Sequence, residues 1–170
     1  MEILYALINL IYQYSYFGIF ILSIISTSTI FFPLPLYAIE FVVSGLGLNP
    51  LIVGISAGFG STIGEFTGYL AGLGGRSVME IEKIKSKFIK KLTKFFSKHG
   101  FLVLLIAALL PFPFDVLGIL AGASKYDIKK FFFATLIGKT LKNLLIAYSG
   151  FFIGSPLFEW IKIVKEVEPL

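Results

Sequence analysis

The chain has no cysteine and a single histidine, His99, among its 170 residues. Without cysteine it can form no disulfide, no Cys-ligated zinc or iron–sulfur site and no thiol nucleophile. One histidine cannot supply the histidine cluster that holds a catalytic metal. We therefore expect neither a metal nor another cofactor.

Charged residues are also scarce, at 15% of the chain against 56% hydrophobic residues. No charge occurs between Glu2 and Glu40, and none occurs between Gly100 and Phe114. Stretches of this length without charge are typical of segments that lie in lipid. The composition therefore predicts a membrane protein and excludes a water-soluble enzyme.

The net charge of +5 does not predict nucleic-acid binding, because eight of the fifteen Lys and Arg residues fall between Arg76 and Lys98. Apolar residues recur at helical spacing in the same stretch, which predicts a basic amphipathic helix on the cytoplasmic leaflet. No Walker loop is present, so we expect no nucleotide partner.

Four apolar blocks, at 3–48, 51–74, 101–123 and 131–154, reach the roughly 20 residues that a helix needs to cross a bilayer. The first block is long enough for two segments. It lacks a basic start and a cleavage site followed by a polar domain, so we expect it to be retained rather than removed as a signal peptide.

Two Pro-x-Pro motifs interrupt apolar blocks near their middles, Pro33 with Pro35 and Pro111 with Pro113. A helix cannot continue through such a motif without losing backbone hydrogen bonds, which must then be buried in protein or face a watery cavity. Both blocks therefore favour re-entrant hairpins. The alternative is a spanning helix with a proline kink.

The distribution of basic residues favours the hairpins. The basic segment before 101–123 and the loop after it, with Lys125, Lys129 and Lys130, both belong on the cytoplasmic side by the positive-inside rule. A hairpin satisfies this rule, whereas a spanning segment would separate the two loops. The predicted order is a span at 3–21, a hairpin at 22–45, a span at 51–74, a basic cytoplasmic segment at 76–100, a hairpin at 101–123, a span at 131–154 and an interfacial tail at 155–170, with the N-terminus cytoplasmic.

The two halves also match in letters, although the offset between matched positions shrinks slightly along the chain. Phe32-Pro33-Leu34-Pro35 aligns with Leu110-Pro111-Phe112-Pro113, and Ile63-Gly64-Glu65 aligns with Ile137-Gly138-Lys139. The predicted fold is thus an all-α polytopic membrane protein, an inverted repeat of hairpin plus span with an extra N-terminal span. Transporters of this design place the substrate where broken helices of the two repeats meet. The alternative is a chance match in a sequence of few letter types.

These motifs resemble the DedA or SNARE-associated Golgi protein family, also called VTT-domain proteins, from about Phe32 to Gly154. The matching letters are Pro33-Leu34-Pro35 followed by Glu40, the run Gly64-Glu65-x-x-Gly68-Tyr69-x-x-Gly72-x-x-Gly75-Arg76, Lys98-His99-Gly100, and Leu110-Pro111 with Ala121-Gly122. The resemblance implies a multi-pass membrane protein with two re-entrant hairpins. It also implies movement of lipids, including polyprenyl-phosphate carriers, often with proton coupling.

The chain departs from the family pattern at the second hairpin. The family usually carries an arginine three residues before the hairpin proline and another three after it, where this chain has Ala108 and Phe114. The resemblance is therefore to a divergent branch.

Three acids lie within the apolar blocks, and charges there usually face a cavity or a partner. Glu40 follows the first hairpin break, Asp115 follows the second, and Glu65 lies in the 51–74 span. We predict that they couple transport to a proton or another ion. The alternative for each is a structural hydrogen bond, with Asp115 capping its half-helix.

Lys139, Lys142 and Asn143 form a polar stripe on the 131–154 span. Because Glu65 and Lys139 occupy aligned positions, we predict that they form an ion pair. The lysines and the two half-helix N-termini favour an anionic head group as the substrate. Alternatively, Lys142 extends its ammonium group to the membrane surface.

Gly60, Gly64, Gly68 and Gly72 repeat every four residues, which predicts close packing against another helix. The partner is either the other repeat or a second copy of the chain.

The sequence thus favours a transporter or scramblase for an anionic lipid, with proton coupling left open. The alternatives are a proton-coupled exporter of ions or small cations and a non-transporting membrane assembly factor. An intramembrane aspartic protease is disfavoured, because Asp115 is the only intramembrane aspartate.

Overall fold

The computed structural model describes residues 16–28, 35–81, 86–110 and 114–157, with no side chain described between 76 and 93. Every regular element among these residues is helical, which confirms the predicted all-α class. In chain order they are a helix at Tyr16–Ser28, α2 (Leu36–Gly45), α3 (Pro50–Ile81), α4 (Ser86–Leu109), α5 (Phe114–Ala123), α6 (Ile128–Ser149) and the π-helical turn η1 (Gly150–Gly154).

Several predicted features lie outside the described residues. They are positions 3–15 of the first predicted span, the hairpin prolines Pro33, Pro111 and Pro113, and positions 158–170 of the predicted tail. Pro35 is described, and it directly precedes α2.

The helices are continuous across three of the predicted segment boundaries. The Tyr16–Ser28 helix crosses the boundary at 21, α3 continues beyond 74, and α4 joins the basic segment to the first arm of the second hairpin. No proline lies inside any of these helices after the first residue, so nothing interrupts their backbone hydrogen bonds.

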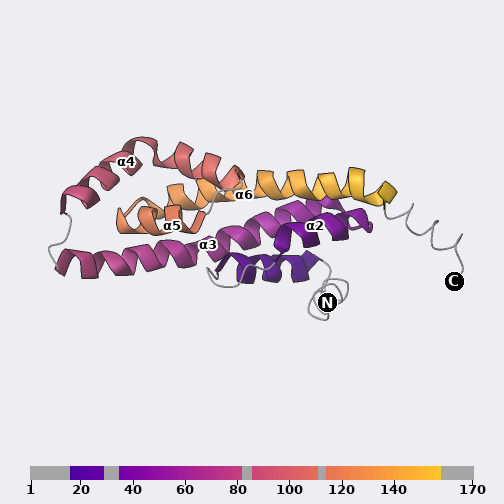
Figure 1. The fold of residues 1–170 in the computed structure, drawn as a ribbon, viewed down its shortest axis with the longest axis horizontal. Coiled ribbons are helices and arrows are strands. Elements are labelled where there is room, and N and C mark those ends of the chain that lie inside the picture. Colours follow the sequence, from indigo (N-terminus) through magenta and orange to yellow (C-terminus); the bar gives the residue numbers. More distant parts are fainter. Residues whose placement is uncertain (1–15, 29–34, 82–85, 111–113, 158–170) are drawn as a thin grey trace, which may run out of the picture.

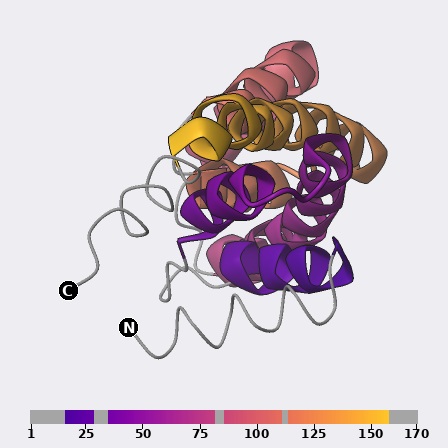
Figure 2. The same ribbon diagram turned by 90° about the vertical axis from the view of Figure 1, so that its right-hand side faces the viewer.

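Antiparallel α3 and α6 form the centre of the bundle (Figure 1). Gly54 lies against Leu144 and Gly58 lies against Thr140, so the residue numbers descend on one helix as they rise on the other. α2 covers the end near η1, whereas α4 and α5 cover the opposite end. Figure 2 shows the Tyr16–Ser28 helix and α4 on opposite sides of the bundle.

The turns before α3 and α6 are built alike. In the first, Gly47 and Leu48 donate backbone hydrogen bonds to Ser44 and Val43; in the second, Lys125 and Tyr126 donate to Gly122 and Ala121. Gly47 and Lys125 both have positive φ, at 110° and 53°, as a helix end of this type requires. Gly47 and Lys125 are separated by the same number of positions as Pro33 and Pro111. We call this separation the repeat offset.

The helix starts that follow match as well. The Asn49 side chain accepts from the Leu51 N–H at 3.0 Å, and the Asp127 side chain accepts from the Lys130 N–H at 2.8 Å. These caps start α3 and α6. Asn49 and Asp127 are again separated by the repeat offset.

The exterior of the bundle is apolar and much of its interior is polar. Large apolar side chains are exposed on every long helix, among them Ile55, Leu70, Leu102, Ile137 and Leu145. Within the described ranges, one helix, Ile128–Leu157, is long and apolar enough to cross a membrane.

Candidate functional site

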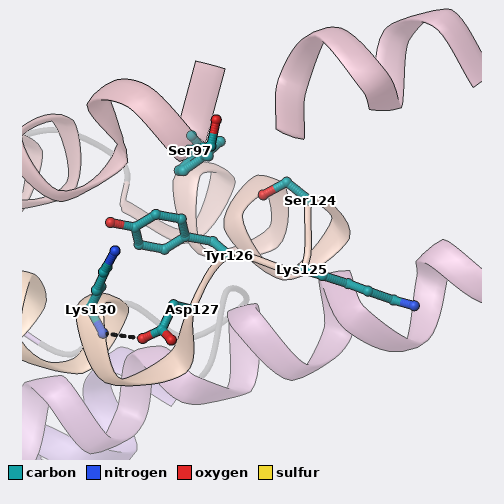
Figure 3. A pocket seen from close by; sticks show the side chains of 7 residues that line it. Ser97, Ser124, Lys125, Tyr126, Asp127 and Lys130 are labelled. Atoms are coloured by element: carbon teal, nitrogen blue, oxygen red, sulfur yellow. Dashed lines mark hydrogen bonds between the residues drawn. The ribbon is translucent and has the colours of Figure 1, made fainter. Parts of the chain in front are cut away.

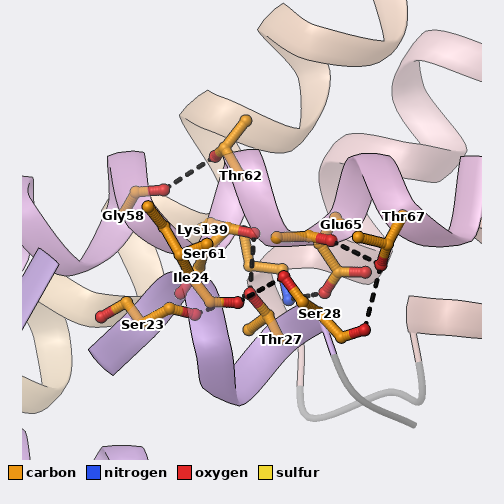
Figure 4. Close-up of polar contacts among 11 residues, drawn as sticks. Ser23, Ile24, Thr27, Ser28, Gly58, Ser61, Thr62, Glu65, Thr67 and Lys139 are labelled. Carbon is orange, nitrogen blue, oxygen red and sulfur yellow. Dashed lines mark hydrogen bonds and ion pairs between the residues drawn. The ribbon is translucent and has the colours of Figure 1, made fainter. Parts of the chain in front are cut away.

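The interior holds an ion pair between α3 and α6. The Lys139 Nζ donates to Glu65 Oε1, and both side chains are buried (Figure 4). Lys139 Nζ also lies 5.1 Å from the centre of the Phe114 ring, at the start of α5. The predicted pair is therefore confirmed as a contact.

A second lysine lies in the same interior. Lys142 Nζ is 5.0 Å from the ring centre of Tyr37 on α2, and Lys142 interacts electrostatically with Glu40, Glu65 and Lys139. Lys142 is 8% exposed, so its ammonium does not extend fully into the surroundings. The sequence reading missed Tyr37, which lies three residues before Glu40 on the same face of α2.

The three acids join these lysines in one cluster. Glu40 is fully buried and interacts electrostatically with Lys142 and Lys139. Asp115, in the first turn of α5, also interacts electrostatically with Glu65, and the two carboxylates repel each other. The structure thus brings together all five charges that the sequence places in the apolar blocks, from α2, α3, α5 and α6. We call Glu40, Glu65, Asp115, Lys139 and Lys142 the charge cluster.

The contacts beside the ion pair agree with the alignment of Gly64 with Gly138. Gly64 lies against the Ile24 carbonyl, Thr27 and the Ser28 N–H, and Gly138 lies against the Leu105 carbonyl, Ala108 and the Leu109 N–H. Gly72 lies against Ile119 of α5, and Gly150 lies against Phe41 of α2, so these two contacts are also related by the repeat offset. The contacts with α5 and α2 thus follow the repeat offset, whereas those of Gly64 and Gly138 follow the shorter offset of the letter alignment.

Hydroxyl groups join the Tyr16–Ser28 helix to α3 beside the ion pair (Figure 4). Thr27 donates to the Ser61 carbonyl at 3.1 Å, and Thr67 donates to the Ser28 carbonyl at 3.2 Å. The sequence reading missed these residues. The signal was the run Ser26-Thr27-Ser28-Thr29 inside an uncharged apolar block.

The four predicted packing glycines have different neighbours. A Cβ on Gly60 or Gly64 would overlap the Tyr16–Ser28 helix, and one on Gly72 would overlap the Ile119 carbonyl. At Gly68 the nearest atom would be 3.5 Å away, which is an ordinary contact. Three of the four thus allow close approach between helices of the same chain.

A separate hollow of about 200 Å³ lies where α4 meets the turn between α5 and α6 (Figure 3). Ser97, Lys125, Tyr126 and Lys130 are among its lining residues. Burial, and to a lesser extent the Asp127 carboxylate, raises the pKa of the Tyr126 hydroxyl. The hollow contains no predicted site residue, but it places the chain before and after 101–123 at the same end of the bundle.

Within the described residues, no three Asp, Glu, His or Cys side chains gather as a metal site.

Comparison with known proteins gives one family and several relatives. The VTT domain model matches residues 32–152. An uncharacterised protein of Methanocaldococcus jannaschii is 29% identical over 142 residues, covering 82% of this chain and 86% of that protein. Two proteins of Lactococcus lactis, from subspecies lactis and cremoris, are named alkaline phosphatase-like. Each is 26% identical over 165 residues, covering 87% of this chain and 75% of the relative. No solved structure matches the chain significantly.

Proposed function

Since the chain belongs to the VTT-domain family of membrane proteins, we propose that it is a transporter or scramblase for an anionic lipid or polyprenyl-phosphate-type carrier. The observation that carries this proposal is the charge cluster, in which acids and lysines from four helices meet inside a bundle with an apolar exterior. Charges inside a membrane protein are costly, and they usually mark a substrate or ion path.

The matched halves support an inverted repeat. The turns, the helix caps and the Gly72 and Gly150 contacts all recur at the repeat offset, while α3 and α6 run in opposite directions. Inverted repeats of this kind are typical of secondary transporters that bind substrate where the repeats meet. The charge cluster contains residues from both halves.

In this proposal the polar groups of α6 bind the head group, and the acids couple its movement to an ion. Lys139, Lys142 and Asn143 would contact the anionic group. Glu40, Glu65 and Asp115 would exchange a proton or a cation. The protein would lie in the cell membrane with its N-terminus and the 76–100 segment in the cytoplasm, where the basic residues favour anionic lipid.

The test is translocation of a fluorescent anionic phospholipid in proteoliposomes, read by quenching from outside, with and without an imposed pH gradient. We expect wild-type protein to expose the inner-leaflet label, and we expect Lys142→Met to slow this by roughly tenfold or more, or about 1.4 kcal/mol of barrier. Lys129→Met is the matched control, because Lys129 is exposed at the start of the same helix.

Protein-free and wild-type liposomes with equal quenching would overturn the proposal. Cation flux without lipid movement would then favour the ion exporter, and inactivity in both assays would favour an assembly factor. The name of the Lactococcus relatives raises a phosphatase as a further competitor. Release of phosphate from p-nitrophenyl phosphate by wild-type protein would favour that activity.

A further inference from the structure

Eight buried side-chain atoms in the described part of the chain have no hydrogen-bond partner, and seven of them are oxygens. Five of the eight belong to Glu40, Ser44 and Asn143, and all three side chains are fully buried. Buried polar atoms in native proteins are nearly always paired, so an unpaired group of this size calls for a bound water or ion.

The three side chains belong to faces of α2 and α6 that pack together. Glu40 and Ser44 are one turn apart on α2, beside Ile39 and Val43; Asn143 is one turn before Ala147 on α6. Ile39, Val43 and Ala147 belong to one buried apolar cluster.

One contact lies on each side of this region. Lys142 lies against Tyr37 at one end, and the Ser155 Oγ donates to the Gly45 carbonyl at 3.0 Å at the other. The corresponding positions of the second half are close together, since a Cβ on Gly118 would be 3.7 Å from the Glu65 carbonyl oxygen. By the repeat offset, Gly118 and Glu65 correspond to Glu40 and Asn143.

The chemistry of these atoms favours a hard cation. Four of the five unpaired atoms of Glu40, Ser44 and Asn143 are oxygens, and hard cations prefer oxygen ligands. An unpaired buried carboxylate is costly. Lys142 and Lys139 attract this carboxylate but donate no hydrogen bond to it, because Lys139 is bonded to Glu65 and Lys142 lies over the Tyr37 ring.

The charge balance favours a single positive charge. The charge cluster contains three acids, Glu40, Glu65 and Asp115, and two lysines, so one negative charge is in excess when all are ionised. A monovalent cation would neutralise that charge, whereas a divalent one would leave a positive charge beside two lysines.

We propose that Glu40, Ser44 and the amide oxygen of Asn143 bind an alkali metal cation between α2 and α6, which leaves the Asn143 amide nitrogen to donate to the anionic head group. The proposal deepens the proposed function by naming the ion that this part of the site takes. Broken helices of secondary transporters supply oxygen ligands to such ions. A bound water or a proton on Glu40 is the competing occupant.

The test is equilibrium binding to purified protein in detergent, which requires no transport. Thermal unfolding is measured at fixed pH and ionic strength, with N-methyl-D-glucamine chloride replaced stepwise by NaCl, KCl or LiCl. We expect a saturable rise of the wild-type Tm by a few degrees in at least one salt, because a ligand that binds only the folded state stabilises it. Comparison of the three salts identifies the preferred ion.

Glu40→Gln, Asn143→Leu and Ser44→Ala should each reduce or abolish this rise. Ser149→Ala, at an exposed hydroxyl on α6, is the matched control and should retain it. Glu40→Gln removes an unpaired buried charge, so its Tm in N-methyl-D-glucamine chloride should be at least that of wild type. Equilibrium dialysis with ²²Na⁺, or ⁸⁶Rb⁺ if K⁺ is preferred, should give about one ion per wild-type chain.

A wild-type Tm that is independent of the alkali cation, with no retained ion in dialysis, would overturn the proposal in favour of water or a proton. An undiminished rise in both Glu40→Gln and Asn143→Leu would also overturn it, because the ion would then bind elsewhere. Neither result decides whether the protein moves lipid, which the proteoliposome assay tests separately. Conversely, ion binding without lipid movement would reject the lipid transporter and keep the cation site.

Discussion

At the scale of single residues, the two oxygens of Glu65 differ in their surroundings. Oε1 accepts from Lys139, whereas Oε2 is buried without a hydrogen-bond partner among the described residues. A buried ion pair adds little net stability, because its attraction is offset by the loss of hydration. Removing one partner is more costly, since the remaining charge stays buried.

We therefore predict strong coupling between Glu65 and Lys139. Lys139→Met and Glu65→Gln should each destabilise the protein by roughly 3 to 5 kcal/mol where the site is dry, and the double variant should be milder than either single one. Thermal unfolding in detergent gives the stability of the wild type, the two single variants and the double variant. Additive effects would mean that the two side chains are energetically independent.

At the scale of helices, glycine decides how closely α5 approaches α3. A Cβ on Gly72 would overlap the Ile119 carbonyl, which belongs to the backbone and cannot rotate away. Gly74, two residues later in the same helix, has no atom within 4 Å of the position of an added Cβ. The two positions share the helical conformation and differ in the space around them.

We predict opposite effects of the same substitution at these positions. Gly72→Ala should lower the stability by about 1 to 3 kcal/mol through overpacking. Gly74→Ala should raise it by about 0.5 to 1 kcal/mol, because alanine favours the helix. Unfolding midpoints of the two variants provide the measurement, and equal midpoints would contradict the close contact between α3 and α5.

At the scale of the whole molecule, α5 returns the chain to the end of the bundle that α4 leaves. α4 leads away from this end and α5 leads back, so Ser97 and Lys125 line the same hollow (Figures 1 and 3). A spanning segment would instead leave these residues on opposite sides of a membrane. The arrangement therefore bears on the orientation of the whole chain.

We predict that cysteines placed at Lys98 and Lys125 react with an impermeant maleimide from the same, cytoplasmic side. Both side chains are exposed, and the chain has no native cysteine to react in the background. Labelling is compared in intact cells and in inverted membrane vesicles. Reaction from opposite sides would show that 101–123 crosses the bilayer, and the inverted repeat would then be rejected.

The sequence by itself determined the helical class, the family and the residues that form the charge cluster. These depend on local features: long uncharged stretches need internally hydrogen-bonded helices, and charges such as Glu40 and Lys142 stand out within them. The family resemblance rests on short sequence motifs, which can be recognised without knowledge of any tertiary contact. The role of each charge in transport stays a prediction.

The tertiary structure alone decided the partners of the polar groups. The letters align Glu65 with Lys139 through the shared Ile-Gly before each of them, but letters alone do not show whether the two side chains touch. The Glu65–Lys139 ion pair is visible only in the folded chain. The contact of Tyr37 with Lys142 joins side chains from opposite halves of the chain, and such distant contacts leave no periodic signal in the sequence.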